Sequence, residues 1–278
     1  MIRKDSPAKV NLILKVLGKR PDGYHDIESL LQKVSLYDEL SFSPGDKGIR
    51  IRCPGTSLPE DEDNIVHRAA SALMSRLPPD AGVEITIRKK IPVAAGLGGG
   101  SSNAAATLCA LNELFGLKLR KEDLMDIGRT LGADIPFFIY ADAAWAFGIG
   151  ERLYPAEHLP KMWFVLANPG FEVSTRTVYE ALNLALTKKR RKDSIRRFKT
   201  VSELAAALWN DLEGVTFHLH PKLREVKDLF VKLGAVGSLM SGSGPTLFGL
   251  FESEGKAARA EEALKRSTNY SIFRAHSI

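Results

Sequence analysis

The residues of this chain that most clearly indicate chemistry are the glycines at positions 96, 98, 99 and 100, which Ser101 and Ser102 follow. Glycines between a strand and a helix let successive backbone N–H groups converge on an anion, and the helix dipole adds partial positive charge. The segment therefore predicts a phosphate-binding loop. A flexible turn is the alternative, but such a turn rarely precedes serines that can cap an alanine-rich helix.

The loop matches neither of two widespread glycine motifs. Position 101 is serine where the dinucleotide-binding pattern G-x-G-x-x-G requires glycine. The chain also contains no Gly-Lys-Ser/Thr sequence, which excludes a Walker A loop. The predicted loop therefore belongs to another class.

Two ionisable residues acquire meaning only in combination with such a loop. Asp134 precedes Ile135 and Pro136, where a carboxylate can simply cap a short helix. Lys9 falls on the polar side of an alternating segment, where most lysines are solvated. Neither residue indicates a function by itself.

The elements that position these residues follow from apolar periodicity. Apolar residues at 8, 10, 12, 14 and 16 predict a half-buried strand whose other, exposed face carries Lys9 and Lys15. A strand over 83–88 leads toward the loop. We expect Ser101 or Ser102 to cap the helix that follows the loop, and Gly116 to end it.

Three more features are predicted in the first half of the chain. The sequence of residues 20–23 is Arg-Pro-Asp-Gly, which is typical of a turn and places Tyr24 and His25 just beyond it. Asn64 is expected to cap a helix that stops before two prolines. A further helix is expected from about 121 to 131.

The second half begins at a domain boundary that we place near Arg152, which divides the chain into domains 1–152 and 153–278. Its periodicity predicts strands at 163–167, 246–251 and 271–274, and helices after residues 174, 201, 221 and 255. This order of elements suggests a small α/β sandwich.

Composition limits the class of protein. The length of 278 residues exceeds what one hydrophobic core usually fills. The net charge of +6 suits anionic small molecules but is too low to indicate nucleic-acid binding. Two isolated cysteines, Cys53 and Cys109, indicate no disulfide framework or zinc site and fit a reducing cytoplasm. Since no apolar run approaches ~20 residues, we expect a soluble protein without a membrane partner. The eight basic residues within 188–199 are expected to form a solvated loop.

Taken together, three separated motifs resemble those of the GHMP kinases, the superfamily that includes galactokinase, homoserine kinase, mevalonate kinase and phosphomevalonate kinase. The motifs are Ser-Pro-Ala-Lys-Val-Asn-Leu at 6–12, Gly-Leu-Gly-Gly-Gly-Ser-Ser-Asn-Ala-Ala at 96–105 and Ser-Gly-Ser-Gly-Pro-Thr at 241–246. Their order and spacing cover nearly the whole chain. The resemblance implies a kinase that uses ATP and Mg²⁺.

Within this superfamily the chain is most similar to the kinases of 4-diphosphocytidyl-2-C-methyl-D-erythritol. The similarity rests on the Pro-Ala-Lys-Val-Asn-Leu sequence, Asp-Gly-Tyr-His at 22–25, Glu-Asp-Asn at 62–64 and Leu-Gly-Ala-Asp-Ile-Pro at 131–136. It implies an α+β fold of two domains. The N-terminal domain would resemble the second domain of ribosomal protein S5, the C-terminal domain would be ferredoxin-like, and both substrates would bind between them.

The resemblance also implies roles for individual residues. Asp134 would accept the proton of the acceptor hydroxyl, and Lys9 would keep Asp134 ionised. ATP would be bound by Pro92, Val93, Ala94, Ala95, Gly96, Leu97, Gly98, Gly99, Gly100, Ser101, Ser102 and Asn64. The partner, a small cytidine diphosphate ester, would be bound by Asn11, Tyr24, His25, Thr175 and Tyr179, with the tyrosines stacking on the base and His25 bonding its edge. The sequence assigns no metal ligand, although Ser102 is one candidate.

Two alternatives stay open at this point. One is a GHMP kinase for another small alcohol, such as homoserine or a mevalonate derivative, which would offer no base for Tyr24 and His25. The other is a non-catalytic relative that binds nucleotide or RNA, against which the presence of both Lys9 and Asp134 argues. The sequence does not indicate an oligomeric state.

Overall fold

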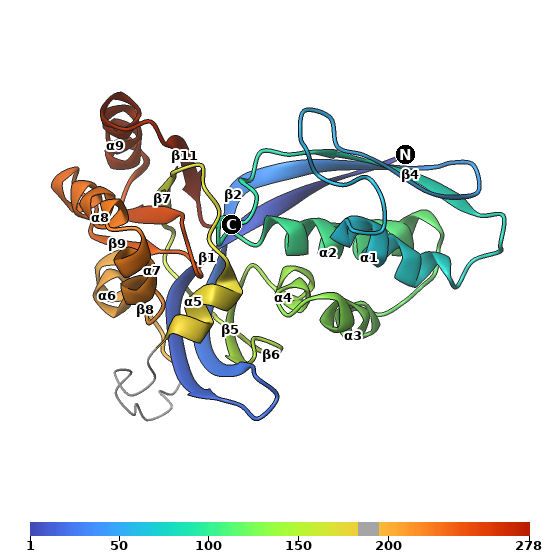
Figure 1. Cartoon of the computed structure of the whole chain (residues 1–278), viewed down its shortest axis with the longest axis horizontal. Coiled ribbons are helices and arrows are strands. Elements are labelled where there is room, and N and C mark those ends of the chain that lie inside the picture. Colours follow the sequence, from blue (N-terminus) through green and yellow to red (C-terminus); the bar gives the residue numbers. More distant parts are fainter. Residues whose placement is uncertain (183–194) are drawn as a thin grey trace. The chain divides into compact units, whose positions relative to one another are not determined.

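A computed structural model of the protein describes residues 1–182 and 195–278. The chain forms two compact units (Figure 1). Unit 1 comprises residues 1–8, 37–91 and 98–142, and unit 2 comprises residues 9–36, 92–97 and 143–278. Strands β1 (Ile2–Lys19) and β2 (His25–Pro44) each continue from one unit into the other. Most of the basic run at 188–199 lies outside the described residues.

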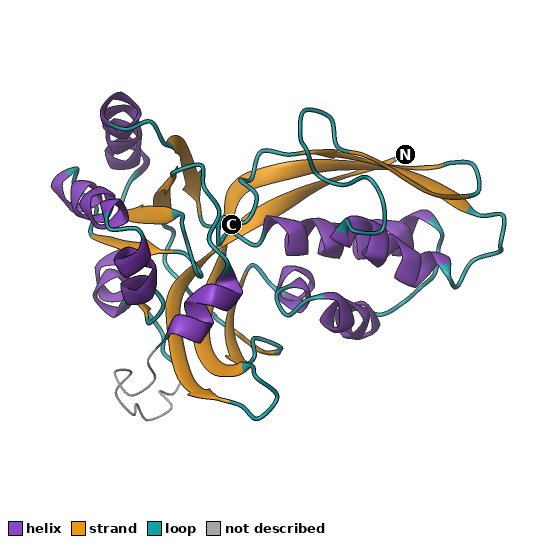
Figure 2. Cartoon of the chain, in the orientation of Figure 1, coloured by secondary structure: helices purple, strands orange, loops and turns teal. Residues whose placement is uncertain are grey.

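Unit 1 contains strands from one part of a sheet, together with helices. Strand β4 (Gly82–Arg88) pairs antiparallel with the Glu39–Pro44 end of β2 and parallel with β3 (Gly48–Arg52). Figure 2 shows its helices on the same side of these strands. They are α1 (Ile65–Met74), α2 (Gly99–Leu114), α3 (Lys121–Leu131) and α4 (Ile135–Tyr140). Helix α2 packs against the other three.

Unit 2 contains an antiparallel sheet in the order β11-β7-β10-β9, formed by Ser271–His276, Trp163–Asn168, Leu247–Phe251 and Gly237–Met240. The His25 end of β2 pairs with β5 (Ala143–Gly148), which pairs with β6 (Arg152–Pro155), and β1 pairs with the short β8 (Trp209–Asn210). The helices are α5 (Thr175–Ala181), α6 (Val201–Ala207), α7 (Glu213–Leu219), α8 (Lys222–Lys232) and α9 (Glu254–Ser267). Helices α8 and α9 pack on the sheet and close an apolar core around Phe230, Phe251 and Leu264.

Local sequence accounts for several helix ends. The side chain of Asn64 accepts a hydrogen bond from Val66 N and caps α1, as predicted. Helix α3 has its predicted bounds. Gly116, at φ 61°, ends α2 in a Schellman motif, because its own N–H and that of Leu117 bond back to carbonyls of the last turn. Within the described ranges, every helix is too short or too polar to cross a bilayer.

Two sequence-based expectations are wrong. The polar face of β1 is buried, because Lys9 is only 4% exposed and Lys15 forms an ion pair with Glu28, which has no exposed surface. Ser101 and Ser102 do not cap α2, because the helix begins before them, at Gly99. The residue at the cap position is Gly98, in the left-handed conformation, with no side chain to donate or accept.

Candidate active site

The first turn of α2 carries the features of an anion site. Its first intrahelical hydrogen bond runs from Ser102 N to Gly98 O, so the N–H groups of Gly99, Gly100 and Ser101 point beyond the helix end. No acidic residue lies in this turn. The partial positive charge of the helix terminus is therefore not offset by a carboxylate from its own first turn.

Buried hydroxyl and amide groups hold this turn from behind. Ser6 Oγ is hydrogen-bonded to Ser102 Oγ at 2.7 Å and to Asn103 Oδ1 at 2.8 Å, and all three side chains are buried. Ser6 belongs to β1, so the bonds join the strand to the start of the helix within unit 1. Ser6 and Asn103 belong to the motifs at 6–12 and 96–105, but the sequence alone predicts no role for either residue.

The preceding part of the loop is held within unit 2 by the segment 241–246. Gly96 O accepts a hydrogen bond from Ser241 Oγ at 2.9 Å, and Leu97 O accepts one from Lys9 N at 2.9 Å. Gly96 has φ 76°, and a Cβ there would lie 2.1 Å from Ser241 O. Only glycine fits this position. Residues of the first and third motifs, Lys9 and Ser241, thus hydrogen-bond to the loop of the second.

Lys9 itself belongs to a buried chain of polar groups in unit 2. Its ammonium donates to Asn11 Oδ1 at 2.6 Å, Asn11 Nδ2 donates to Ser29 Oγ at 2.9 Å, and Ser29 Oγ donates to Ile13 O at 2.7 Å. These hydrogen bonds fix the orientation of the Asn11 amide, because its oxygen must accept from the lysine and its nitrogen must donate to the serine.

Aromatic side chains meet at another point of unit 2. The rings of His25 and Tyr179 have centroids 5.0 Å apart and an interplanar angle of 31°. Tyr24, next to this pair in sequence, is 60% exposed, so its ring is open to a ligand. Burial and the charge of Lys19 lower the pKa of His25 below its ordinary 6.5, so its ring is neutral at pH 7. A neutral imidazole offers one donor and one acceptor.

The remaining predicted site residues have defined positions. Thr175 begins α5, and its hydroxyl lies 2.8 Å from Ser243 Oγ. In unit 1, Asp134 occupies the cap position of α4, but its carboxylate makes no capping bond to that helix. Asn64 uses its oxygen to cap α1 and its nitrogen to donate to Pro59 O at 2.7 Å. Lys9 and Asp134 belong to different units, so their pairing stays a prediction.

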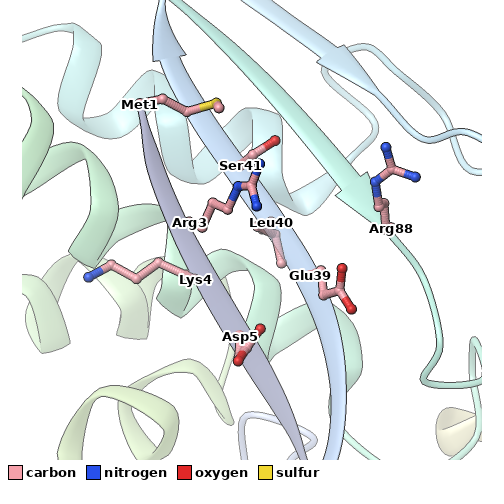
Figure 3. A pocket seen from close by; sticks show the side chains of 8 residues that line it. All are labelled: Met1, Arg3, Lys4, Asp5, Glu39, Leu40, Ser41 and Arg88. Atoms are coloured by element: carbon pink, nitrogen blue, oxygen red, sulfur yellow. The ribbon is translucent and has the colours of Figure 1, made fainter.

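A cavity of about 450 Å³ lies elsewhere in unit 1, and none of the predicted site residues lines it. Figure 3 shows its side chains on β1 and at Met1 just before it, on β2 and at the end of β4. The lining residues are Met1, Arg3, Lys4, Asp5, Glu39, Leu40, Ser41 and Arg88. Among residues 1–182 and 195–278, no three His, Cys, Asp or Glu side chains are grouped as metal ligands.

Comparison with known proteins places this geometry in a family. Residues 64–142 match the family described as "GHMP kinases N terminal domain", and residues 181–270 match "GHMP kinases C terminal". A 4-diphosphocytidyl-2-C-methyl-D-erythritol kinase of Syntrophus aciditrophicus (strain SB) is 58% identical over 278 residues, which is 100% of both chains.

Solved structures agree with the sequence comparison. A crystal structure of 4-(cytidine 5'-diphospho)-2C-methyl-D-erythritol kinase is 38% identical, covers 99% of each chain and has a TM-score of 0.85. A homoserine kinase from Cytophaga hutchinsonii shares the fold at 22% identity, with a TM-score of 0.74 over 100% of this chain and 94% of its own. The α+β fold predicted from the motifs is confirmed. The chain belongs to the GHMP kinases, and within them to the family of 4-diphosphocytidyl-2-C-methyl-D-erythritol kinases.

Proposed function

We propose that the protein transfers the γ-phosphoryl group of ATP to a hydroxyl of 4-diphosphocytidyl-2-C-methyl-D-erythritol, a step toward isoprenoid precursors by the route that does not use mevalonate. The observation that carries this proposal is the 58% identity over the full length of a relative with that name. His25 in unit 2 supports it, because its neutral ring lies beside the ring of Tyr179, and a cytidine substrate offers a base that such side chains can bind.

ATP would be held mainly by the backbone of the segment from Pro92 to Ser102, with Asn64 nearby in unit 1. The N–H groups of Gly99, Gly100 and Ser101 suit phosphate oxygens, and no carboxylate in that turn opposes them. Mg²⁺ would neutralise charge on the transferred phosphoryl group. Mg²⁺ bound to nucleotide phosphates usually keeps several waters and needs only one or two protein ligands. Ser102 stays a candidate ligand, although its hydroxyl is buried beside Ser6.

Asp134 would accept the proton of the acceptor hydroxyl while that oxygen attacks the γ-phosphorus and the bond to ADP breaks. Little proton transfer is needed early in a loose transition state, so positioning and charge supply most of the acceleration. The ammonium of Lys9 would keep Asp134 ionised.

The cytosine would be recognised by side chains of unit 2. Tyr24 and Tyr179 would stack on the base, and His25 would meet its polar edge with one donor and one acceptor. Asn11 and Thr175 would contact the rest of the ester. Each residue already has a neighbour that orients it, namely Lys9 for Asn11 and Ser243 for Thr175.

The test is a comparison of initial rates with ATP and four alcohols: the cytidylyl ester, free methylerythritol, homoserine and mevalonate. The ester should be strongly preferred, because the remote base helps to hold the reacting hydroxyl in line. Comparable use of free methylerythritol, or preference for homoserine or mevalonate, would show that the acceptor is misassigned. An RNA-binding relative would instead bind RNA tightly with a steep salt dependence and no turnover.

The proposal also includes a domain boundary and a cellular location. We place the domain boundary near Arg152, between the two family matches, which end at 142 and begin at 181. Limited proteolysis that cuts first within 143–180 would support it. We also place the reaction in the cytoplasm, which fractionation of the native host would test.

A further inference from the structure

The carboxylate of Asp38 is fully buried in unit 1 and has no part in the proposed chemistry. Its Oδ1 accepts hydrogen bonds from Lys90 N at 2.7 Å and Ile91 N at 2.9 Å, and its Oδ2 accepts one from the Lys89 ammonium. Burying a carboxylate is costly unless its acceptors are used. Here donors from three consecutive residues use them.

These three residues occupy a special place in the chain. Strand β4 ends at Arg88, so the N–H groups of Lys90 and Ile91 have left the sheet and require other acceptors. Pro92, the first residue of the predicted ATP-binding segment, follows directly. A single oxygen that accepts from two consecutive N–H groups fixes the orientation of both peptide planes at this point.

The same residues lie beneath the start of α2. A Cβ built on Gly99 would lie 3.0 Å from Ile91 Cγ2 and 3.2 Å from Lys89 Nζ. The first residue of the helix therefore rests on the two side chains that Asp38 helps to hold. Gly99 does not have a positive φ, so glycine is needed here for this close approach and not for backbone conformation.

We propose that Asp38 is a positioning residue for ATP: it sets the place of the α2 N-terminus through Lys89 and Ile91. This inference rests on the proposed binding of ATP phosphates by that terminus. Asp38 touches no substrate, so its loss should weaken ATP binding by displacing N–H groups, and should leave the acceptor alcohol unaffected.

The neighbouring pair of residues provides a matched control. Glu39 follows Asp38 in β2 and pairs with Lys90 at 2.6 Å, but both side chains are about half exposed. The two ion pairs join the same strand and segment. Only the Asp38 pair is buried and accepts from the backbone.

The experiment compares Asp38→Asn/Lys89→Met with Asp38→Leu/Lys89→Met. Both double variants lack the buried charges, so any direct effect of Lys89 cancels, and only the asparagine variant keeps an oxygen for the two N–H groups. We expect the leucine variant to show a KM for ATP and a Kd for ADP at least tenfold higher than the asparagine variant. The KM for the acceptor should agree within twofold, and Glu39→Gln should change neither constant beyond twofold.

Equal ATP and ADP constants in the two double variants would overturn the inference, as would an equal rise in both KM values. If the leucine variant does not fold, the asparagine variant is compared with Lys89→Met by amide hydrogen exchange. Faster exchange at Lys90 and Ile91 without a rise in the Kd for ADP would then overturn it.

Failure of the proposed function would look different. If the wild-type protein binds ADP but phosphorylates another alcohol, the proposed acceptor is wrong. The role of Asp38 is then decided by the Kd values for ADP alone. Wild-type protein that binds no adenine nucleotide would overturn both proposals.

Discussion

The region proposed to bind phosphate uses backbone groups, whereas the region proposed to bind the base uses side chains. At the start of α2 the binding groups are backbone N–H groups, and glycines at 98, 99 and 100 leave them uncovered. Around His25 the binding groups are side chains, and the backbone only presents them. The first kind of region tolerates almost no added atoms, whereas the second depends on the atoms that its side chains supply.

The start of α3 makes the first half of this contrast plainer. That helix, also in unit 1, begins with a capping box in which Asp123 bonds the backbone of Arg120, and Glu122 adds a second carboxylate to the first turn. Carboxylates of the protein itself therefore offset the partial positive charge at the start of α3. Helix α2 has no such cap and no acidic residue in its first turn, as the proposed binding of ATP phosphates at its N-terminus requires.

The largest expected effect concerns the residue that would act on the acceptor itself. Asp134→Ala should lower kcat by about 10²–10⁴-fold, because a positioned base contributes that much, while ADP still binds at α2. Steady-state kinetics and calorimetric titration with ADP check both halves. Near-native turnover would mean that Asp134 is not the base.

The coupling of Asp134 to Lys9 has a separate test. Lys9→Ala should also lower kcat, and the double variant should lose less than the two single losses combined, because both residues act on one charge. The measurement is kcat of wild type, the two single variants and the double variant. If the losses in kcat simply multiply, Lys9 and Asp134 act independently.

Adding atoms to the phosphate-binding backbone should have the next largest effect. Gly98→Val should raise the KM for ATP at least tenfold, because Gly98 has φ 68° and a β-branched residue is strained there by about 1–3 kcal/mol. Gly116→Ala is the control at the other end of α2, also at positive φ. It should lower stability by about 1 kcal/mol without changing nucleotide affinity. Equal effects of both variants on the KM for ATP would remove the contrast.

Removing side chains should act on the other region. Tyr24→Ala and His25→Ala should each raise the KM for the cytidylyl substrate about tenfold, since stacking of one base is worth ~1–3 kcal/mol. The KM for ATP should barely change. His276→Ala, which breaks a ring contact with Trp163 in the same unit, serves as control and should leave both KM values near native. Indifference to His25→Ala would mean that the base is bound elsewhere.

The smallest effect is a dependence on pH. The pKa of folded His25 lies below 6.5, so the unfolded chain takes up this proton first as pH falls. The free energy of unfolding should therefore be unaffected by His25 above pH 7 and should decline through the acid side of 6.5. Urea titrations of wild type and His25→Gln between pH 7.5 and 5.5 should show a shallower decline in the variant. Identical slopes would mean that the folded and unfolded pKa values are equal.

The sequence by itself determined the features that depend on neighbours along the chain. Asn64 indicated a helix cap and Gly116 a helix end, and the structure has both, because turns and caps are set by residues within a few positions. The glycine spacing indicated a loop before a helix, and its binding of phosphate stays a prediction. The three motifs also sufficed to predict the family and the α+β fold.

Tertiary structure alone decided which polar residues are buried and what they meet. Strand β2 went unpredicted because buried Glu28, Gln32, Lys33 and Asp38 interrupt the apolar alternation. Lys9 was expected in solvent because it lies on the polar side of an alternating strand, and such positions usually face water. Burial of such side chains is tolerated because partners bond them, and some of these partners are distant in sequence, such as Lys89 for Asp38. Periodicity along one strand carries no information about such partners, so the burial of these groups and the positioning role proposed for Asp38 emerge only from the folded chain.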